Sequence, residues 1–191
     1  MRLNMGNKAV FVFLADGFEE IEALTPVDLL RRAGAEVITV GVTGKTVTGS
    51  HGIAVSADVT AEEADGMLKD GVQPAMVVLP GGMPGAANLD ESPLVDAYIV
   101  AALQADAYIA AICAAPMILG KRGLLKGKKA VCYPGFEEHL TGAEVLDAPA
   151  VQDGKIITGR AMGAATEFAL LLVSAVCGGS KAVAIRKGVL A

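Results

Sequence analysis

The sequence contains no tryptophan, only two histidines and only three cysteines, and each scarcity excludes a class of site. Cys113, Cys132 and Cys177 cannot all pair and form no CxxC spacing, which excludes a disulfide framework and a thiolate zinc centre. With His51 and His139 alone, most histidine-rich metal sites are excluded as well. No GxGxxG or P-loop fingerprint occurs either. We therefore expect neither a metal nor a cofactor.

Long hydrophobic runs and basic stripes are also missing. Although 53% of the residues are hydrophobic, no run approaches the roughly 20 apolar residues of a membrane helix. The apolar run at 9–15 that follows the first seven residues is too short for a signal peptide, so we expect a cytoplasmic protein with no membrane partner. The net charge is −5, from 16 basic and 21 acidic residues, so nucleic acid is not an expected partner.

What the sequence does contain is an alternation of apolar runs and amphipathic segments. This alternation is typical of an α/β domain with a mostly parallel sheet and helices on both faces. Buried strands are expected at 8–15, 35–42, 74–80 and 107–113, and helices at 19–34, 60–71, 94–105 and 115–123. The length of 191 residues suits one domain over residues 1–191, with its core at about 8–178.

The other segments are less regular. We expect a hairpin at 43–58, a glycine-rich loop at 81–93 and a short helix within 134–142. Two β-like pieces follow at 148–159, and the last predicted helix is 163–179. Thr60 and Glu63 form a predicted capping box at the start of the second helix.

Cys113 lies where a buried strand ends and a helix begins, with Pro116 suited to the first helical turn. A thiol at such a corner lies near the amino end of the helix, whose free amides and dipole lower the pKa of a cysteine. The alternative is an inert core thiol, because free cysteine is among the most buried residue types. Position alone favours the inert thiol.

Three acidic residues open the first predicted helix. Glu19 and Glu20 are explained by the helix dipole, which favours acids in the first turn. Glu22 lies where the apolar face of the helix turns inward, so its carboxyl is expected to stay protonated and to donate to a thiolate or shuttle a proton. Nothing in the local sequence brings Glu22 to Cys113.

Further candidates follow other predicted strands. The amides of Gly81 and Gly82 form either an oxyanion site or a plain tight turn. His51 is either an anion ligand or a surface imidazole, and Arg160 either an anion clamp or a surface arginine. The remaining cysteines are interpreted as structural, and His139 as part of a solvated helix face.

Four stretches joined together resemble a known family. "FLADGFEEIEALTPVDLLRRAGAEV", "VVLPGGMPGAANL", "IAAICAAPMIL" and "ITGRAMGAATEFALLLV" are similar to the ThiJ/PfpI superfamily, in particular to the branch of the parkinsonism-associated protein and its bacterial relative YajL. The resemblance covers about residues 8 to 178, with the motifs in the same order. The combination of "GFEEIEA", "LPGG" and "AAICA" is specific, whereas each alone is weak.

This resemblance implies a flavodoxin-like three-layer sandwich, similar to class I glutamine amidotransferases, that forms a homodimer. It implies that Cys113 is the reactive cysteine on a nucleophile elbow and Glu22 the glutamate that hydrogen-bonds the thiol. The pocket amides then correspond to Gly81, Gly82 and Ala114. Arg160 corresponds to the family's anion-binding arginine, and His51 to a hairpin residue that reaches the pocket from the other subunit.

At two positions this sequence differs from the family pattern, and these differences reduce the number of activities that the resemblance implies. Ala114 stands where protease-like members carry a histidine, and Tyr133 stands where some relatives place another, which leaves a Cys113–Glu22 dyad. The resemblance then implies a cofactor-independent enzyme for small dicarbonyls, of glyoxalase III or deglycase type, which converts methylglyoxal to lactate. The alternative is a redox-sensing stress protein or chaperone that uses the same thiol. A cysteine peptidase is less favoured, and an inert structural domain is the third interpretation.

Overall fold

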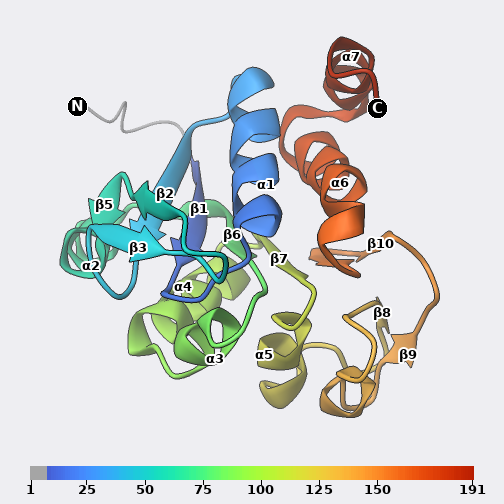
Figure 1. Cartoon of the computed structure of the whole chain (residues 1–191), viewed down its shortest axis with the longest axis horizontal. Coiled ribbons are helices and arrows are strands. Elements are labelled where there is room, and N and C mark those ends of the chain that lie inside the picture. Colours follow the sequence, from blue (N-terminus) through green and yellow to red (C-terminus); the bar gives the residue numbers. More distant parts are fainter. Residues whose placement is uncertain (1–7) are drawn as a thin grey trace.

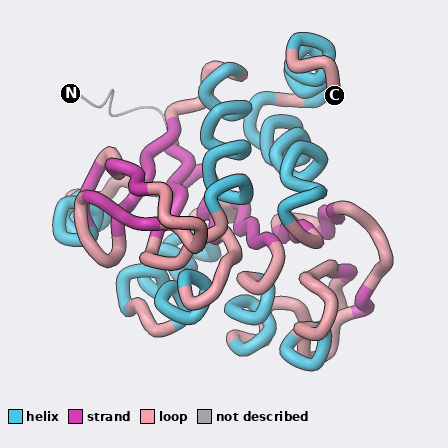
Figure 2. The backbone as a smooth tube through the Cα atoms, in the orientation of Figure 1, coloured by secondary structure: helices cyan, strands magenta, loops and turns pink. Residues whose placement is uncertain are grey.

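A computed structural model describes residues 8–191; residues 1–7, where we expected no signal peptide, lie outside the described residues. Seven strands form one sheet in the order β10-β11-β7-β6-β1-β2-β5 (Figures 1 and 2). Every neighbouring pair is parallel except β10 and β11. The bounds are β1 Ala9–Leu14, β2 Val37–Gly41, β5 Val59–Thr60, β6 Pro74–Leu79, β7 Tyr108–Ile112, β10 Ala150–Asp153 and β11 Ile156–Gly159.

Helices cover both faces of this sheet, as the alternating sequence predicts. One face carries α1 (Glu20–Arg32) and α6 (Ala165–Cys177), which lie side by side in Figure 1. The other carries α2 (Ala61–Lys69), α3 (Gly85–Asp90), α4 (Pro93–Gln104) and α5 (Pro116–Lys121). Successive strand residues point to opposite faces. Strand β1 accordingly sends Phe11 and Phe13 to one core and Val10, Val12 and Leu14 to the other.

Several local predictions are confirmed. Thr60 caps α2, and the backbone N–H of Thr60 donates to Glu63 while that of Glu63 donates to Thr60, which is the expected capping box. The hairpin consists of β3 (Thr46–Thr48) and β4 (Ala54–Ser56). The turn of this hairpin lies against the segment before α1, where the Ser50 N–H donates to the Phe18 carbonyl at 2.8 Å.

Three predicted elements differ from the structure. The loop at 81–93 contains α3, because Gly85 packs against the backbone of Gly17 and its N–H donates to that carbonyl. The helix within 134–142 is only a 3-10 turn, Glu137–His139, between glycines with positive φ. The last predicted helix, 163–179, forms as α6 and ends at Gly178 (φ 90), and a further helix, α7 (Gly179–Gly188), follows that was not predicted. A short two-stranded sheet of β8 (Lys129–Ala130) and β9 (Glu144–Val145) completes the fold.

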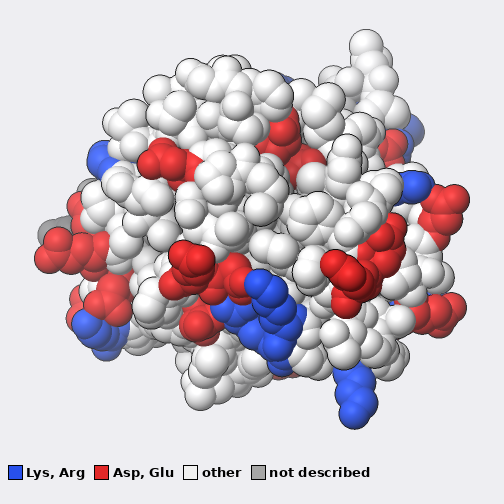
Figure 3. Space-filling model, turned by 60° about the horizontal axis from the view of Figure 1, so that its bottom comes forward, with Lys and Arg blue, Asp and Glu red and all other residues white. Residues whose placement is uncertain are grey.

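The charged side chains on the surface and the apolar character of the helices agree with the amino-acid composition. On the face shown in Figure 3, acidic side chains are spread widely and basic ones stand beside them. Arg122, for example, forms ion pairs with both Asp90 and Asp96. Within residues 8–191, no helix combines the length and the apolar character that crossing a bilayer requires.

Candidate active site

Cys113 occupies a sharp corner between β7 and α5. Its φ of 65° lies in the left-handed region, which a non-glycine residue rarely adopts and which is common at functional sites. Two hydrogen bonds hold this backbone: the Cys113 N–H donates to the Gly159 carbonyl at 2.9 Å, and its carbonyl accepts from the Tyr133 N–H at 2.8 Å. The half-buried thiol therefore stands at the carboxyl edge of the sheet, where open α/β folds bind ligands.

The charge state of the Cys113 thiol differs from the expectation. Burial, followed by the charge of Glu22 and a hydrogen bond with it, raises the pKa of Cys113 to about 12. The backbone amides of Gly82 and Ala114 lower the pKa of the thiol, but by less. The prediction of a lowered thiol pKa is therefore wrong, because desolvation and the neighbouring Glu22 outweigh the amides of Gly82 and Ala114.

Glu22 is the buried acid beside this thiol. Only 1% of its surface is exposed, and burial raises its pKa to about 7, although a hydrogen bond with Cys113 and the Gly81 amide oppose the shift. The Gly81 N–H donates to Oε2 at 3.1 Å. Within the described part of the chain, Oε1 has no partner in good hydrogen-bond geometry. A buried oxygen without a partner is costly, so this carboxyl is set to exchange a proton.

Cys113 and Glu22 therefore titrate as a pair. When the pair carries one negative charge, its remaining proton lies either on the sulfur or on the carboxyl. The amides of Gly82 and Ala114 favour the thiolate, while the Gly81 amide favours the carboxylate. Both the nucleophile and its proton acceptor are thus present in one buried arrangement.

The glycine-rich loop after β6 fits closely between Cys113 and the loop after β1. A Cβ on Gly81 would lie 2.5 Å from Glu22 Oε2 and 2.6 Å from Cys113 Cβ, so a side chain cannot be accommodated there. The Gly81 carbonyl accepts from the Glu19 N–H at 2.9 Å. Two amides of this loop therefore act on different groups. The Gly81 N–H donates to the Glu22 carboxylate, whereas the Gly82 amide lowers the pKa of the Cys113 thiol.

Tyr133 and Arg160 follow the segments whose backbones bond to Cys113: Tyr133 itself donates to the Cys113 carbonyl, and Arg160 comes directly after Gly159. Tyr133 is linked to Cys113 through its backbone, and its half-exposed ring packs edge-on against Phe136 at 6.4 Å. The Arg160 guanidinium forms an ion pair with Asp147. Arg160, Asp147 and Cys132 line a cavity of about 220 Å³. The expected anion clamp stays a prediction.

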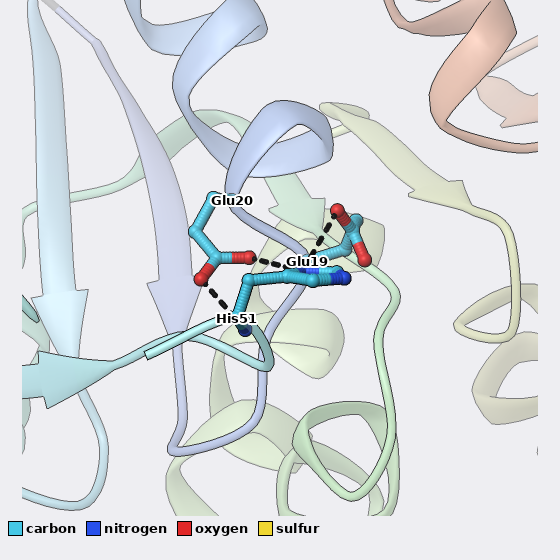
Figure 4. Close-up of side chains that lie close together, drawn as sticks. All are labelled: Glu19, Glu20 and His51. Carbon is cyan, nitrogen blue, oxygen red and sulfur yellow. Dashed lines mark hydrogen bonds and ion pairs between the residues drawn. The ribbon is translucent and has the colours of Figure 1, made fainter. Parts of the chain in front are cut away.

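His51 does lie near the start of α1, but in contact with acids of its own chain. Its Nδ1 is 3.1 Å from Glu20 Oε2 and 3.6 Å from Glu19 Oε1 (Figure 4). Glu20 was interpreted only as a complement to the helix dipole, yet it is 5% exposed and accepts the N–H groups of His51 and Ile53. No sequence signal pointed to this cluster, because its members meet only when the hairpin folds back.

Neither histidine forms a catalytic pair with the cysteine among residues 8–191. His51 contacts Glu19 and Glu20, and His139 lies beside Phe136 and Glu138. Cys132 is buried, and burial raises its pKa to about 11; burial also raises the pKa of Cys177. Among the three thiols, Cys113 is the one whose pKa is lowered by backbone amides.

Comparison with known proteins identifies the family. Residues 8–175 match the DJ-1/PfpI family. Protein dj-1beta of Drosophila melanogaster is 36% identical over 187 residues, which cover 96% of this chain and 97% of that protein. A protein of Pyrococcus abyssi named as a deglycase is 32% identical over 157 residues, or 81% of this chain and 90% of the relative.

A solved structure shows the same architecture. Oxidized DJ-1 of Toxoplasma gondii superposes with a TM-score of 0.88 at 34% identity, and the match covers 96% of this chain and 98% of that one. Together with the family match and the full-length relatives, the flavodoxin-like sheet and its helices identify the fold. The chain belongs to the DJ-1/PfpI family.

Proposed function

We propose that this protein is a cofactor-independent cysteine enzyme that acts on small reactive dicarbonyls such as methylglyoxal, with Cys113 and Glu22 as its dyad. The observation that carries the proposal is the pairing of a thiol on a left-handed corner with a buried carboxyl whose pKa is raised to about 7. A pKa near neutrality is what a proton shuttle requires. The deglycase name of the archaeal relative supports the same class of substrate.

The chemistry begins with the thiolate of Cys113. Glu22 takes up the proton of the Cys113 thiol, and the thiolate adds to the aldehyde carbon. Glu22 then returns this proton to the oxyanion that forms beside the amides of Gly82 and Ala114, which completes the hemithioacetal and leaves Glu22 as a carboxylate. Glu22 Oε1 then removes the proton from that carbon and returns it to the adjacent one, which converts the hemithioacetal into a thioester. Water hydrolyses the thioester to lactate and restores the thiol. The net reaction adds one water and needs no external oxidant.

The test is lactate formation from methylglyoxal without glutathione. Wild type should turn over, Cys113→Ser should lose at least about a thousandfold in kcat/KM, and the matched Cys132→Ser should keep its activity. A second measurement, single-turnover trapping of the thioester by mass spectrometry, should place the adduct on Cys113. Wild-type turnover no faster than that of Cys113→Ser would overturn the proposal.

A second function, oxidation of the Cys113 sulfur, is favoured by Glu22 and by the amides of Gly82 and Ala114 around it. We propose that peroxide oxidises Cys113 to the sulfenic and then the sulfinic acid, whose oxygens accept the Gly82 and Ala114 amides and the Glu22 proton. Peptide mass spectrometry after mild peroxide treatment should find oxidation at Cys113 before Cys132 or Cys177. Equal oxidation of all three thiols would contradict this role.

We also propose that the chain forms a homodimer through the surface around the start of α1. Two large apolar side chains there are open to solvent, Ile21 at 46% and Ile53 at 55% exposed. Burying such side chains is the main gain when subunits associate. Sedimentation equilibrium should give twice the 19.4 kDa chain mass for wild type, and Ile21→Glu should shift it towards the monomer. A wild-type monomer would contradict the dimer.

A further inference from the structure

Outside the dyad, charged side chains join the carboxyl ends of α3 and α5, which are neighbours in Figure 1. Asp90 is the last residue of α3, Lys121 is the last residue of α5, and Arg122 follows directly. Arg122 Nη1 donates to Asp90 Oδ1 at 2.6 Å, and Lys121 Nζ donates to Asp90 Oδ2 at 2.5 Å. Both oxygens of one carboxylate on α3 are thus held from the end of α5. We call these three residues the α3–α5 clamp.

The guanidinium of Arg122 also binds the backbone of both helices. Its Nη2 donates to the Asp90 carbonyl at 3.0 Å, and its Nη1 donates to the Ile118 carbonyl at 2.9 Å. The last carbonyls of a helix have no N–H partner within it, so one planar side chain caps two helices at once. Only 21% of the Arg122 side chain and 14% of the Asp90 side chain are exposed, so solvent screens this ion pair less than a surface pair.

The amino ends of the same two helices lie at the thiol. Helix α3 continues from the glycine-rich loop, since the Gly82 carbonyl accepts the Ala86 N–H at 2.9 Å. Helix α5 continues from the corner, since the Ala114 carbonyl accepts the Met117 N–H at 3.1 Å. The two backbone amides that act on the Cys113 thiol are those of Gly82 and Ala114. Each of these amides is therefore attached to one of the two clamped helices.

We propose that the α3–α5 clamp positions the Gly82 and Ala114 amides beside the Cys113 thiol. Each helix has six residues and is only about 9 Å long at 1.5 Å per residue, so a shift at its carboxyl end is carried to its amino end. The contact at the amino ends leaves little room, because a Cβ on Gly81 would lie 2.6 Å from Cys113 Cβ. Arg122 is thus a positioning residue that acts through α3 and α5.

Asp96 separates this role from ion pairing in general. Arg122 Nε donates to Asp96 Oδ1 at 2.7 Å, but Asp96 lies on α4 and its side chain is 54% exposed. Loss of Asp96 therefore removes an ion pair of the same arginine and leaves α3 tied to α5. Asp96→Asn is the matched control for Arg122→Met.

The first test is the rate at which iodoacetamide modifies Cys113 in the full chain at pH 8, followed by peptide mass spectrometry. Arg122→Met should react at least about tenfold more slowly than wild type, because misplaced amides stabilise the thiolate less. Asp96→Asn should react as wild type does. Arg122→Lys, which keeps a charge for Asp90, should react within about threefold of wild type.

The second test deepens the proposed function, on which it rests. For methylglyoxal, Arg122→Met should lower kcat at least about tenfold and leave KM within about twofold, because the amides act on the reacting atoms. If wild type does not turn over while Arg122→Met still slows the alkylation of Cys113, the enzyme proposal fails and the clamp stands. If wild type turns over and Arg122→Met matches Asp96→Asn in both assays, the clamp is overturned and the enzyme proposal stands.

Two more variants exclude a general loss of stability. Arg31→Met removes the ion pair with Asp58 at the end of α1, so it should lower the free energy of unfolding in urea without slowing the alkylation of Cys113. Equal slowing in Arg31→Met would overturn the inference. Asp90→Asn keeps the size of the side chain and the carbonyl contacts of Arg122, and it should slow alkylation at least about threefold even if Arg122→Met does not fold. A wild-type rate in Asp90→Asn would also overturn the inference.

Discussion

Glu20 and Glu22 stand two residues apart on α1, both are buried, and they have opposite proton affinities. The pKa of Glu20 is lowered to about 2, because hydrogen bonds from its own backbone and from the side chain and N–H of His51 overcome the desolvation that raises it. The pKa of Glu22 is raised to about 7, because burial outweighs its contacts with Cys113 and Gly81 and the charge of Glu19 adds to the shift.

The comparison shows that the balance between hydrogen-bond donors and burial decides the charge of a carboxyl. Both side chains are at least nine-tenths removed from solvent. Glu20 receives the hairpin amides at one oxygen and an imidazole at the other, whereas Glu22 keeps an oxygen without a partner. The first carboxyl is therefore a permanent anion that holds the hairpin, and the second is available for proton transfer.

The largest expected effect contrasts the two glutamates in catalysis. Glu22→Gln should lower kcat/KM for methylglyoxal by at least about a hundredfold, because it removes the proton shuttle but keeps the shape. Glu20→Gln should cost at least ten times less. Steady-state lactate formation measures both. Equal losses in the two variants would remove the functional distinction between these acids.

The second prediction concerns the spacing that keeps Glu22 next to Cys113. Gly81→Ala should reduce kcat/KM by about a hundredfold, because its Cβ would displace either Glu22 Oε2 or Cys113, and small misplacements have large effects on rate. Gly66→Ala is the matched control, since it lies in α2 with nothing within 4 Å of the added carbon. If Gly81→Ala stays active, close packing at this loop is not required.

The third prediction tests Glu20 as a structural anion. Glu20→Ala leaves the N–H groups of His51 and Ile53 without their acceptor, so the free energy of unfolding should fall by about 3 kcal/mol. Urea unfolding near neutral pH measures this loss. Because the pKa of Glu20 is lowered from 4.5 to about 2, its contribution is present above pH 4.5 and disappears as the pH falls towards 2. A stability difference that does not shrink in acid would contradict this role.

The smallest effect is a pH dependence of the opposite sign. Since the pKa of Glu22 is raised from 4.5 to about 7, its favourable contribution is complete below pH 4.5 and is lost as the pH rises through 7. Between about pH 5 and pH 8.5, wild type should therefore lose about 2 kcal/mol relative to Glu22→Gln. Urea unfolding of both at these two pH values gives the difference. A constant gap would mean that the folded protein does not raise this pKa.

Much of the fold could be predicted because the signals are local. The strands at the centre of the sheet are short apolar runs, and the capping box at Thr60 needs only letters three positions apart. Helix α3 was missed, because contacts of Gly85 with the loop after β1 override the preference of the glycine-rich segment. The helix within 134–142 was predicted, but only the 3-10 turn Glu137–His139 forms there. The corner at Cys113 was predicted in position, although its φ of 65° could not be.

The candidate site was predictable only in pieces. Cys113, Glu22 and the glycine loop were each identified, but only the resemblance to a family joined them. The direction of the Gly81 amide towards Glu22 rather than the sulfur depends on backbone orientation, which no sequence pattern records. The raised pKa of Cys113 likewise depends on how deeply the sulfur is buried.

The sequence by itself determined the layered α/β architecture and the order of its reactive residues, because hydrophobic periodicity and motif order are written along the chain. Only the tertiary structure decided the protonation of Glu20 and Glu22 and the meeting of Glu19, Glu20 and His51. The physical reason is that a pKa reflects the donors, charges and solvent around a group. Those surroundings come from segments that are distant in sequence and become neighbours only when the sheet and the hairpin form.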